Sequence, residues 1–169
     1  FDRDYAMFVL RPEVDWAKLR KEYRPKALAS QSTHEFAEVC AEMLLPLRDL
    51  HIWMTVAGVN VPVFNRPRSG NSNPSAHRAI LGELKQAGNV HWAVTADKIG
   101  FIAIYGWNAG PEIPAQVDEA LEQMRDTRGL IMDVRLNGGG DEPPAGQVAG
   151  RFLAEEFVYS YSQFRKGNK

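Results

Sequence analysis

Residues 129–142, with the sequence GLIMDVRLNGGGDE, constrain the possible folds of this chain more than any other segment. A short apolar run from Leu130 to Val134 follows a glycine and leads into a glycine-rich stretch, which is typical of a buried strand. Asn137 and three glycines then interrupt the run, and an apolar pattern with helical period resumes at Ala145. The segment therefore predicts a strand, a glycine turn and a helix in succession.

Three consecutive glycines can place backbone N–H groups at the mouth of a site, because no Cβ blocks the approach of a ligand. The positive end of the following helix favours an anion there. Phosphate fits poorly, since no G-x-G-x-x-G or Gly-Lys-Ser/Thr pattern is present and Asp141 and Glu142 follow directly. A carbonyl oxygen that becomes an anion only in a transition state fits better. A purely structural tight turn is an equally open interpretation.

Four segments of the chain resemble motifs of the S41 serine peptidases, the family of the C-terminal processing and tricorn-core proteases. Residues 129–140 resemble the family's core motif. Residues 99–104, IGFIAI, resemble the strand before it, and residues 148–152, VAGRF, resemble the helix after it. Residues 47–51, LRDLH, resemble the L-x-D-x-H that ends the N-terminal helical segment of the family. The resemblance extends over roughly residues 30–165, in the family's order.

This resemblance implies an α+β fold. A helical segment over residues 1–50 would lead into a truncated ClpP/crotonase-like α/β core over residues 51–169. Some members of the family carry a PDZ domain between these parts, but the interval 58–88 is too short for an independent domain. We therefore expect a relative without a PDZ domain, closer to the tricorn core than to the processing proteases.

The resemblance also assigns site residues. From residue chemistry alone, His51 is a histidine at a helix C-terminus, favoured there by the helix dipole. The resemblance implies instead that His51 is the general base that activates a serine, a role suited to histidine. Asp49 would orient the imidazole, or would point away along an extended segment. Gly138, Gly139 and Gly140 would supply the amides of an oxyanion hole.

The serine nucleophile of the family lies in a later segment that has no counterpart here. Ser160 and Ser162 fall in an alternating run, without the small-residue elbow that exposes a nucleophile. We therefore expect the first half of a peptidase unit, inactive alone, with the serine beyond residue 169. The alternatives are a non-catalytic relative that binds peptides and, from the strand–glycine–helix order alone, a nucleotide-binding domain.

Composition excludes several classes of protein. The chain has 169 residues, of which 44% are hydrophobic and 24% charged, as in ordinary globular proteins. A net charge of −1 gives no general attraction to nucleic acid or anionic membrane, and no apolar run approaches the roughly 20 residues of a membrane span. Cys40, the single cysteine, cannot form an intrachain disulfide and falls in an apolar helical stripe, which indicates a core residue. We predict no metal and no cofactor, because no ligand cluster is evident.

The expected partner is a peptide or unfolded protein substrate. The expected sheet ends at an unpaired edge strand with an exposed apolar face. We therefore predict self-association through that edge or a complementary C-terminal part that covers it. The chain begins at Phe1 without a signal peptide, so we expect a trimmed or processed fragment. Its compartment, exported or cytoplasmic, stays open.

Local patterns predict the remaining elements. A capping box at Ser32–Glu35 opens the clearest helix, Pro25 ends the helix before it, and His91 beside Trp92 is expected to be structural. Helices are expected near residues 15–24, 36–47, 77–84, 113–124 and 145–153, and strands over residues 52–56, 59–64, 90–95, 99–105, 130–134 and 157–164.

Overall fold

The computed structural model describes residues 1–67, 70–108, 110 and 112–161. The chain has two compact units, the first containing Phe1–Arg68 and the second containing Ser69–Tyr159. Each unit combines helices with strands, so the expected α+β class is confirmed. Within the described residues, no helix is both long enough and apolar enough to cross a membrane.

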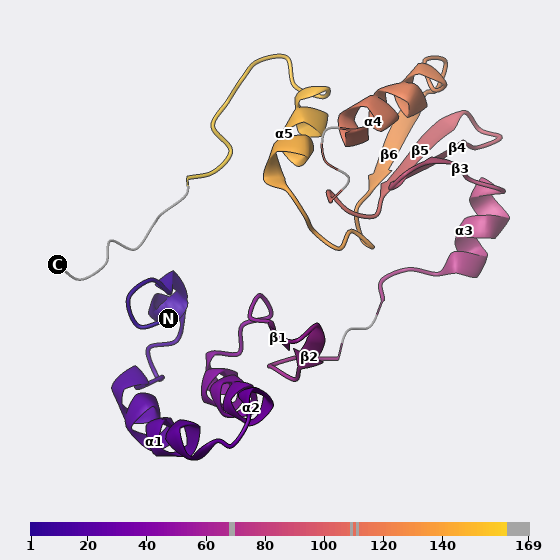
Figure 1. The fold of residues 1–169 in the computed structure, drawn as a ribbon. Helices are drawn as coiled ribbons and strands as arrows, with labels where there is room; N and C mark the ends of the chain where they lie inside the picture. The colour runs from indigo at the N-terminus through magenta and orange to yellow at the C-terminus, as the bar shows by residue number, and fades with distance from the viewer. Residues whose placement is uncertain (68–69, 109, 111, 162–169) are drawn as a thin grey trace. The chain divides into compact units, whose positions relative to one another are not determined.

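The first unit consists of helices and a two-stranded hairpin (Figure 1). In chain order its elements are the 3₁₀ helix η1 (Ala6–Leu10), α1 (Trp16–Ala29), α2 (Thr33–Leu44), the 3₁₀ helix η2 (Leu45–Leu47), β1 (Met54–Val56) and β2 (Val59–Val61). Helices α1 and α2 contact each other, and β1 pairs antiparallel with β2. Ala37 and Ala41 of α2 are buried together with Val61 of β2, which attaches the hairpin to the helices.

The predicted start of α2 is confirmed, and the predicted end of the helix before it is wrong. Ser32 Oγ accepts a hydrogen bond from the Glu35 amide at 3.1 Å, while the Glu35 carboxylate accepts from the Gln31 amide. Pro25, however, lies inside α1, which continues to Ala29. The fixed φ of proline is that of a helix, so the chain can continue through it with the loss of one intrahelical hydrogen bond.

The two units divide at Arg68, not at the expected boundary after residue 50. The reason is the hairpin, since Met54 and Val56 of β1 pack against the same small cluster as Val61. The hairpin thus shares a core with α2. Strand β2 also ends at Val61, three residues before the predicted end of that strand.

The second unit is built on a four-stranded sheet with the order β3-β4-β5-β6. In chain order its elements are α3 (Pro74–Leu81), β3 (Lys85–Ala87), β4 (Val90–Val94), β5 (Ile99–Ile104), α4 (Glu112–Glu122), β6 (Gly129–Asp133) and α5 (Glu142–Gly150). Strands β3, β4 and β5 are antiparallel neighbours, and β6 pairs parallel with β5, with Ala103 opposite Asp133. Helix α4 makes the crossover that a parallel pair requires.

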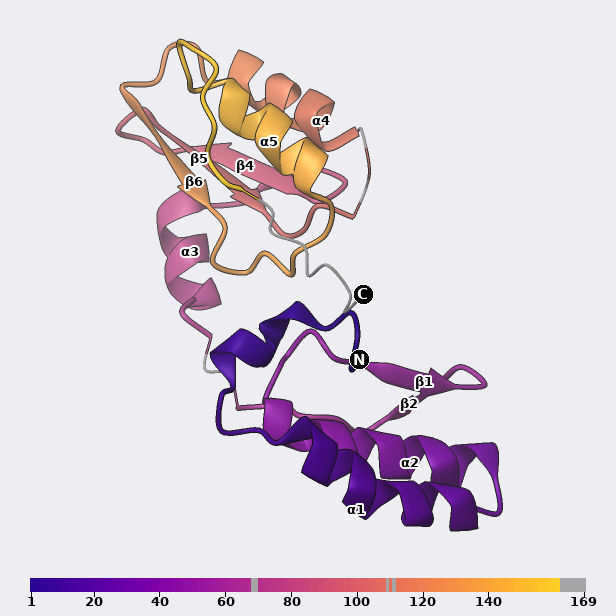
Figure 2. The same cartoon turned by 90° about the vertical axis from the view of Figure 1, so that its left-hand side faces the viewer.

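Alternate residues of β5 face different surroundings. Ile102 and Ile104 are buried with Val117 of α4 and Val148 of α5 in the main hydrophobic core. Phe101 lies on the opposite face, where its ring centroid is 5.9 Å from that of His77 in α3. Figures 1 and 2 show α4 and α5 on one side of the sheet and α3 on the other. The carboxyl ends of β5 and β6 therefore lie side by side between two helical layers.

Two predictions in this unit need correction, and one strand was not predicted. The helix expected over residues 77–84 is α3, which begins at Pro74 because Asn73 caps it, and which ends before Gly82, where φ is 68°. Residues 85–87 form β3, because they pair with β4. The strand expected over residues 157–164 is absent from residues 157–161, and its last three residues lie outside the described part.

Strand β6 lies at the edge of the sheet. Among the described residues it pairs with β5 alone. Leu130 and Met132 pack on the main core, whereas Ile131 on the other face is 54% exposed. The prediction of a buried strand is therefore correct for one face only, the one that the helices α4 and α5 cover.

Ile102→Ala should lower the free energy of unfolding by about 2–5 kcal/mol, because the residue is fully buried and alanine leaves a cavity. Ile131→Ala on the neighbouring strand is the matched control and should cost less than about 1 kcal/mol. Urea unfolding followed by circular dichroism measures both values. Equal losses for the two variants would contradict the assignment of the two faces.

Candidate functional site

The predicted site residues form two groups, one in each compact unit. Gly138, Gly139 and Gly140, here called the glycine segment, follow β6 in the second unit. Asp49 and His51 follow η2 in the first unit. In each group, polar side chains hold the surrounding backbone in place.

The glycine segment lies against the chain that leaves β5. The Gly138 amide donates to Tyr105 O at 2.9 Å, and the Trp107 amide donates to Gly139 O at 2.8 Å. An isolated parallel bridge joins Trp107 to Gly140. The pairing of β5 with β6 therefore continues past the strand ends, and the segment is an extension of the sheet.

Asn137 holds the glycine segment through its side-chain amide. Its Nδ2 donates to Ile104 O at 2.9 Å, and its Oδ1 accepts from the Gly139 amide at 2.8 Å. One short side chain thus connects the end of β5 to the middle of the segment. An apolar side chain at this position would leave both backbone groups without these partners.

Of the three predicted donor amides, Gly140 alone is free for a ligand. The Gly138 and Gly139 amides donate within the chain, to Tyr105 O and Asn137 Oδ1. The Gly140 amide makes no hydrogen bond in the part of the chain that the structure describes. A free backbone N–H just before the start of α5 can donate to a polarised or anionic oxygen.

Position 140 is suited to glycine for two reasons. Its φ of 132° is a conformation that residues with a side chain rarely adopt. An added Cβ would also collide with Asn108 Oδ1 and would lie 2.7 Å from the Trp107 carbonyl carbon. At Gly139 the φ is 92°, but no atom lies within 4 Å of an added Cβ. Close packing therefore distinguishes Gly140 from its neighbour.

The side chain of Arg135 connects the turn after β6 to the segment around α3 by hydrogen bonds. Its Nε and Nη2 donate to the two carboxylate oxygens of Asp133 at 2.9 and 2.8 Å. Its Nη1 donates to Asn71 O at 3.0 Å, and its Nη2 lies 2.8 Å from His77 Nε2. Because a guanidinium can only donate, His77 Nε2 accepts, and the ring hydrogen of a neutral His77 lies on Nδ1.

The carboxylate of Asp133 is buried, with 7% of its side chain exposed. The hydrogen bond from the Arg135 side chain lowers the pKa of Asp133 below its ordinary value and outweighs burial, which acts in the opposite direction. The pair therefore stays ionised, and both oxygens of the buried carboxylate have partners.

Asp49 connects His51 to the N-terminal segment of the first unit. Its Oδ1 accepts from the His51 amide at 2.8 Å and lies 3.3 Å from His51 Nδ1. Its Oδ2 accepts from the Tyr5 hydroxyl at 2.8 Å. Asp49 thus lies beside the imidazole, in the position that an orienting carboxylate occupies.

The surroundings of Asp49 favour its ionised form. Burial raises the pKa of Asp49, but hydrogen bonds from the His51 amide, the Tyr5 hydroxyl and the His51 ring together lower it below the ordinary value. Burial and the same carboxylate raise the pKa of Tyr5 to about 12, so that Tyr5 stays a donor at neutral pH.

The His51 ring is open to solvent on the side away from Asp49. Its side chain is 92% exposed. A cavity of about 410 Å³ in the first unit borders this histidine, with Phe1, Tyr5 and Trp53 among its lining residues. The imidazole is therefore accessible to a reacting group.

Other residues that the sequence singled out lie outside both groups. The His91 ring packs edge-on against Tyr105 with 4.7 Å between the centroids, and burial lowers the pKa of His91. Cys40 is half-buried, and burial raises the pKa of its thiol. Ser160 is exposed, and Ser162 lies outside the described residues. Within those residues, no three metal-ligating side chains come together.

The sequence analysis missed the roles of Asp133, Arg135 and Asn137. The sequence could have indicated a partner for Asp133. This residue ends an apolar strand, where burying a carboxylate is unfavourable unless it is paired. Residues two apart on an extended chain point to the same side, which makes Arg135 the natural partner. The contacts of Asn137 depend on the turn after β6 and carry no such local signal.

Comparisons with known proteins agree with the resemblance noted in the sequence. The family model described as peptidase family S41 matches residues 98–169, and that of the tricorn protease C1 domain matches residues 11–45. The glycine segment lies within the first range, whereas His51 lies in neither. None of the curated proteins compared matches this chain.

A solved structure also matches. It is described as the crystal structure of a "putative peptidase" from Parabacteroides merdae, with a TM-score of 0.79 and 26% sequence identity over 98% of this chain. The chain spans 53% of that protein, about half of its length. The match confirms the expected fold, a helical N-terminal segment followed by a truncated α/β peptidase core.

Gly140→Ala should destabilise the second unit by about 1–3 kcal/mol, because alanine tolerates neither the φ nor the contact with Trp107. Gly146→Ala in α5 is the control, since no atom lies within 4 Å of its added Cβ. The control should be neutral or stabilising by about 0.5–1 kcal/mol. Thermal unfolding measures the difference, and a Gly140→Ala protein as stable as the wild type would contradict the close packing.

Asp133→Asn should lower the free energy of unfolding at pH 7 by about 1.5–3 kcal/mol, because the buried side chain at position 133 loses its charge-assisted hydrogen bonds with Arg135. A carboxyl with a lowered pKa stabilises the fold above its unfolded pKa of about 3.9, and this contribution is lost as the pH falls through its folded pKa. The difference in the free energy of unfolding between wild type and variant should therefore become smaller below about pH 4. Urea unfolding at pH 7 and pH 3 tests this, and a gap that does not change with pH would contradict the ion pair.

Proposed function

Since residues 98–169 match the model of peptidase family S41, we propose that the chain is the N-terminal part of a serine-type, tricorn-like peptidase that hydrolyses peptide bonds in short or unfolded polypeptides. The observation that carries the proposal is the free Gly140 amide, in a segment whose other two amides are held by Tyr105 and Asn137. A fixed donor with no internal partner is what an oxyanion hole requires.

The Gly140 amide is assigned as a donor to the oxyanion. When a serine oxygen attacks the scissile carbonyl carbon, the carbonyl oxygen gains negative charge and accepts from this N–H. One such donor is worth about 10²–10³ in kcat when it is fixed before the reaction. Gly138 and Gly139 are assigned to positioning, because their own amides are already used.

His51 is assigned as the general base. Its Nε2 would take the serine proton and return it to the leaving amine. Asp49 is assigned as a positioning residue, because its carboxylate faces Nδ1 at 3.3 Å and is itself held by Tyr5. The charge of Asp49 would stabilise the imidazolium that forms during the transfer.

The nucleophilic serine is assigned to a part of the protein beyond these 169 residues. Ser32 is occupied in capping α2, and no serine hydroxyl contacts a histidine among the residues that the structure describes. This observation also supports a second candidate, a non-catalytic relative that binds peptides through the same segment. A fluorophosphonate probe distinguishes the two in the full-length protein, because it labels only an activated serine.

The open edge of β6 supports a further partner, either a complementary C-terminal part or a second copy of the chain. Its outer edge has no partner strand within the described residues, and Ile131 and Val134 are about half exposed. An unpaired edge with apolar side chains is stabilised when another strand covers it.

His51→Ala in the full-length protein should lower kcat for a peptide substrate by about 10²–10⁴, because the serine loses its base. His34→Ala is the matched control, since His34 lies exposed on α2 beside Glu38 and has no assigned role. Hydrolysis of a fluorogenic peptide measures both variants. Equal activity of the His51→Ala protein and the wild type would remove His51 from the role.

A further inference from the structure

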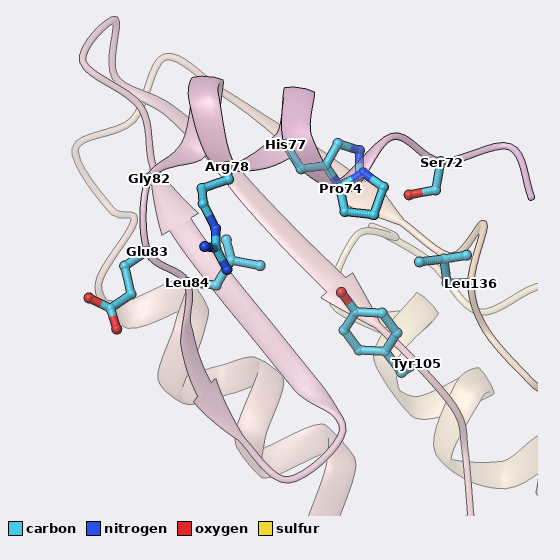
Figure 3. A pocket seen from close by; sticks show the side chains of 9 residues that line it. All are labelled: Ser72, Pro74, His77, Arg78, Gly82, Glu83, Leu84, Tyr105 and Leu136. Carbon is cyan, nitrogen blue, oxygen red and sulfur yellow. The ribbon is translucent and has the colours of Figure 1, made fainter.

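A cavity of about 650 Å³ lies in the second unit, next to the glycine segment (Figure 3). Tyr105 and Leu136 line one part of it and Arg78 lines another. Tyr105 O accepts from the Gly138 amide, and Leu136 directly precedes Asn137. A ligand in this cavity would therefore adjoin the backbone that presents the Gly140 amide.

Three polar side chains around the cavity can donate hydrogen bonds and have no partner. Within the described residues, Arg78 forms no ion pair, and the hydroxyls of Ser72 and Tyr105 make no hydrogen bond. His77 adds an Nδ1–H donor, because its Nε2 accepts from Arg135. Several unsatisfied donors around one cavity favour a ligand rich in acceptor oxygens.

The two charged side chains that line the cavity point in different directions. In Figure 3 the Arg78 side chain extends across Leu84, and the Tyr105 hydroxyl points toward the same space. The carboxylate of Glu83 points away from Tyr105 in this view. The lining thus contains one arginine and one glutamate, and the arginine extends toward the space that the Tyr105 hydroxyl faces.

We propose that this cavity binds a carboxylate of the peptide substrate close to the scissile bond, with Arg78 as its charged partner. The proposal rests on the peptidase function proposed above. A planar guanidinium matches a carboxylate with two parallel hydrogen bonds, and the Tyr105 hydroxyl can add a third. Pro74 and Leu136 offer apolar contact to the methylene groups of an acidic side chain.

Other side chains fit this cavity less well. An aliphatic side chain would cover the Tyr105 hydroxyl without offering it a hydrogen-bond partner, which is unfavourable. A lysine or arginine would meet the like charge of Arg78. The carboxylate can come from an internal Asp or Glu or from the C-terminus of the peptide, and both sources offer the same chemistry to the guanidinium.

The test is a binding titration with the 169-residue chain and fluorescent peptides, which needs no catalysis. One pair of capped, amidated peptides differs only by Glu against Gln at a single internal position. A second pair carries Gln internally and ends in a free carboxylate or an amide. We expect the wild type to bind one of the carboxylate peptides about tenfold more tightly than its neutral counterpart, as one charge-assisted contact provides.

Arg78→Gln should abolish this preference and leave the affinity for the neutral peptides unchanged. Arg125→Gln, which removes the same charge near the end of α4 on the opposite side of the sheet, should keep the preference. Thermal unfolding of both variants confirms that they are folded. The pair of peptides that shows the tenfold difference identifies whether the carboxylate comes from an internal side chain or from the C-terminus.

Three results would overturn the proposal. They are equal binding of charged and neutral peptides by the wild type, an equal loss of preference in both arginine variants, and no binding of any peptide. None of them removes the peptidase assignment, because serine labelling and hydrolysis by the full-length protein test that function separately.

Discussion

The side chain of Asn137 makes the interaction on which the glycine segment depends. By donating to Ile104 O and accepting from the Gly139 amide, it keeps the chain after β6 aligned with the chain after β5. A tight turn aligns antiparallel strands, but it cannot align β5 and β6, because the neighbouring ends of parallel strands are not connected to each other. The Asn137 side chain has both a donor and an acceptor, so it can hydrogen-bond to both segments at once. The orientation of the Gly140 amide follows from it, since the two amides before it have their partners within the chain.

A second polar connection, between Asp133 and Arg135, links this segment to the other face of the sheet. The guanidinium reaches Asn71 O and His77 Nε2 as well as the carboxylate, so the end of β6 and the start of α3 are held together. The same contact determines which nitrogen of His77 can donate. The electrostatics of the cavity beside the glycine segment are thus determined in part by a residue that does not line it.

The sequence predicted the class of fold and most elements, because periodicity and capping are local signals. The capping box at Ser32, the strand that became β5 and the helix that became α4 are examples. The extension of α1 through Pro25 and the pairing of residues 85–87 were missed, because packing and strand pairing decide them. For the candidate site, the sequence indicated the glycines. It could not indicate which of the three amides stays unpaired, since that depends on contacts with Tyr105 and Asn137.

The open edge of β6 has a consequence for the control of activity. The carboxyl ends of parallel strands lie at the same edge of a sheet, so a strand that joined β6 in parallel would end beside the glycine segment. Completion of the sheet and delivery of a reactive side chain to the Gly140 amide would then be a single event. In the peptidase proposed above, catalysis would therefore begin only when that strand is in place.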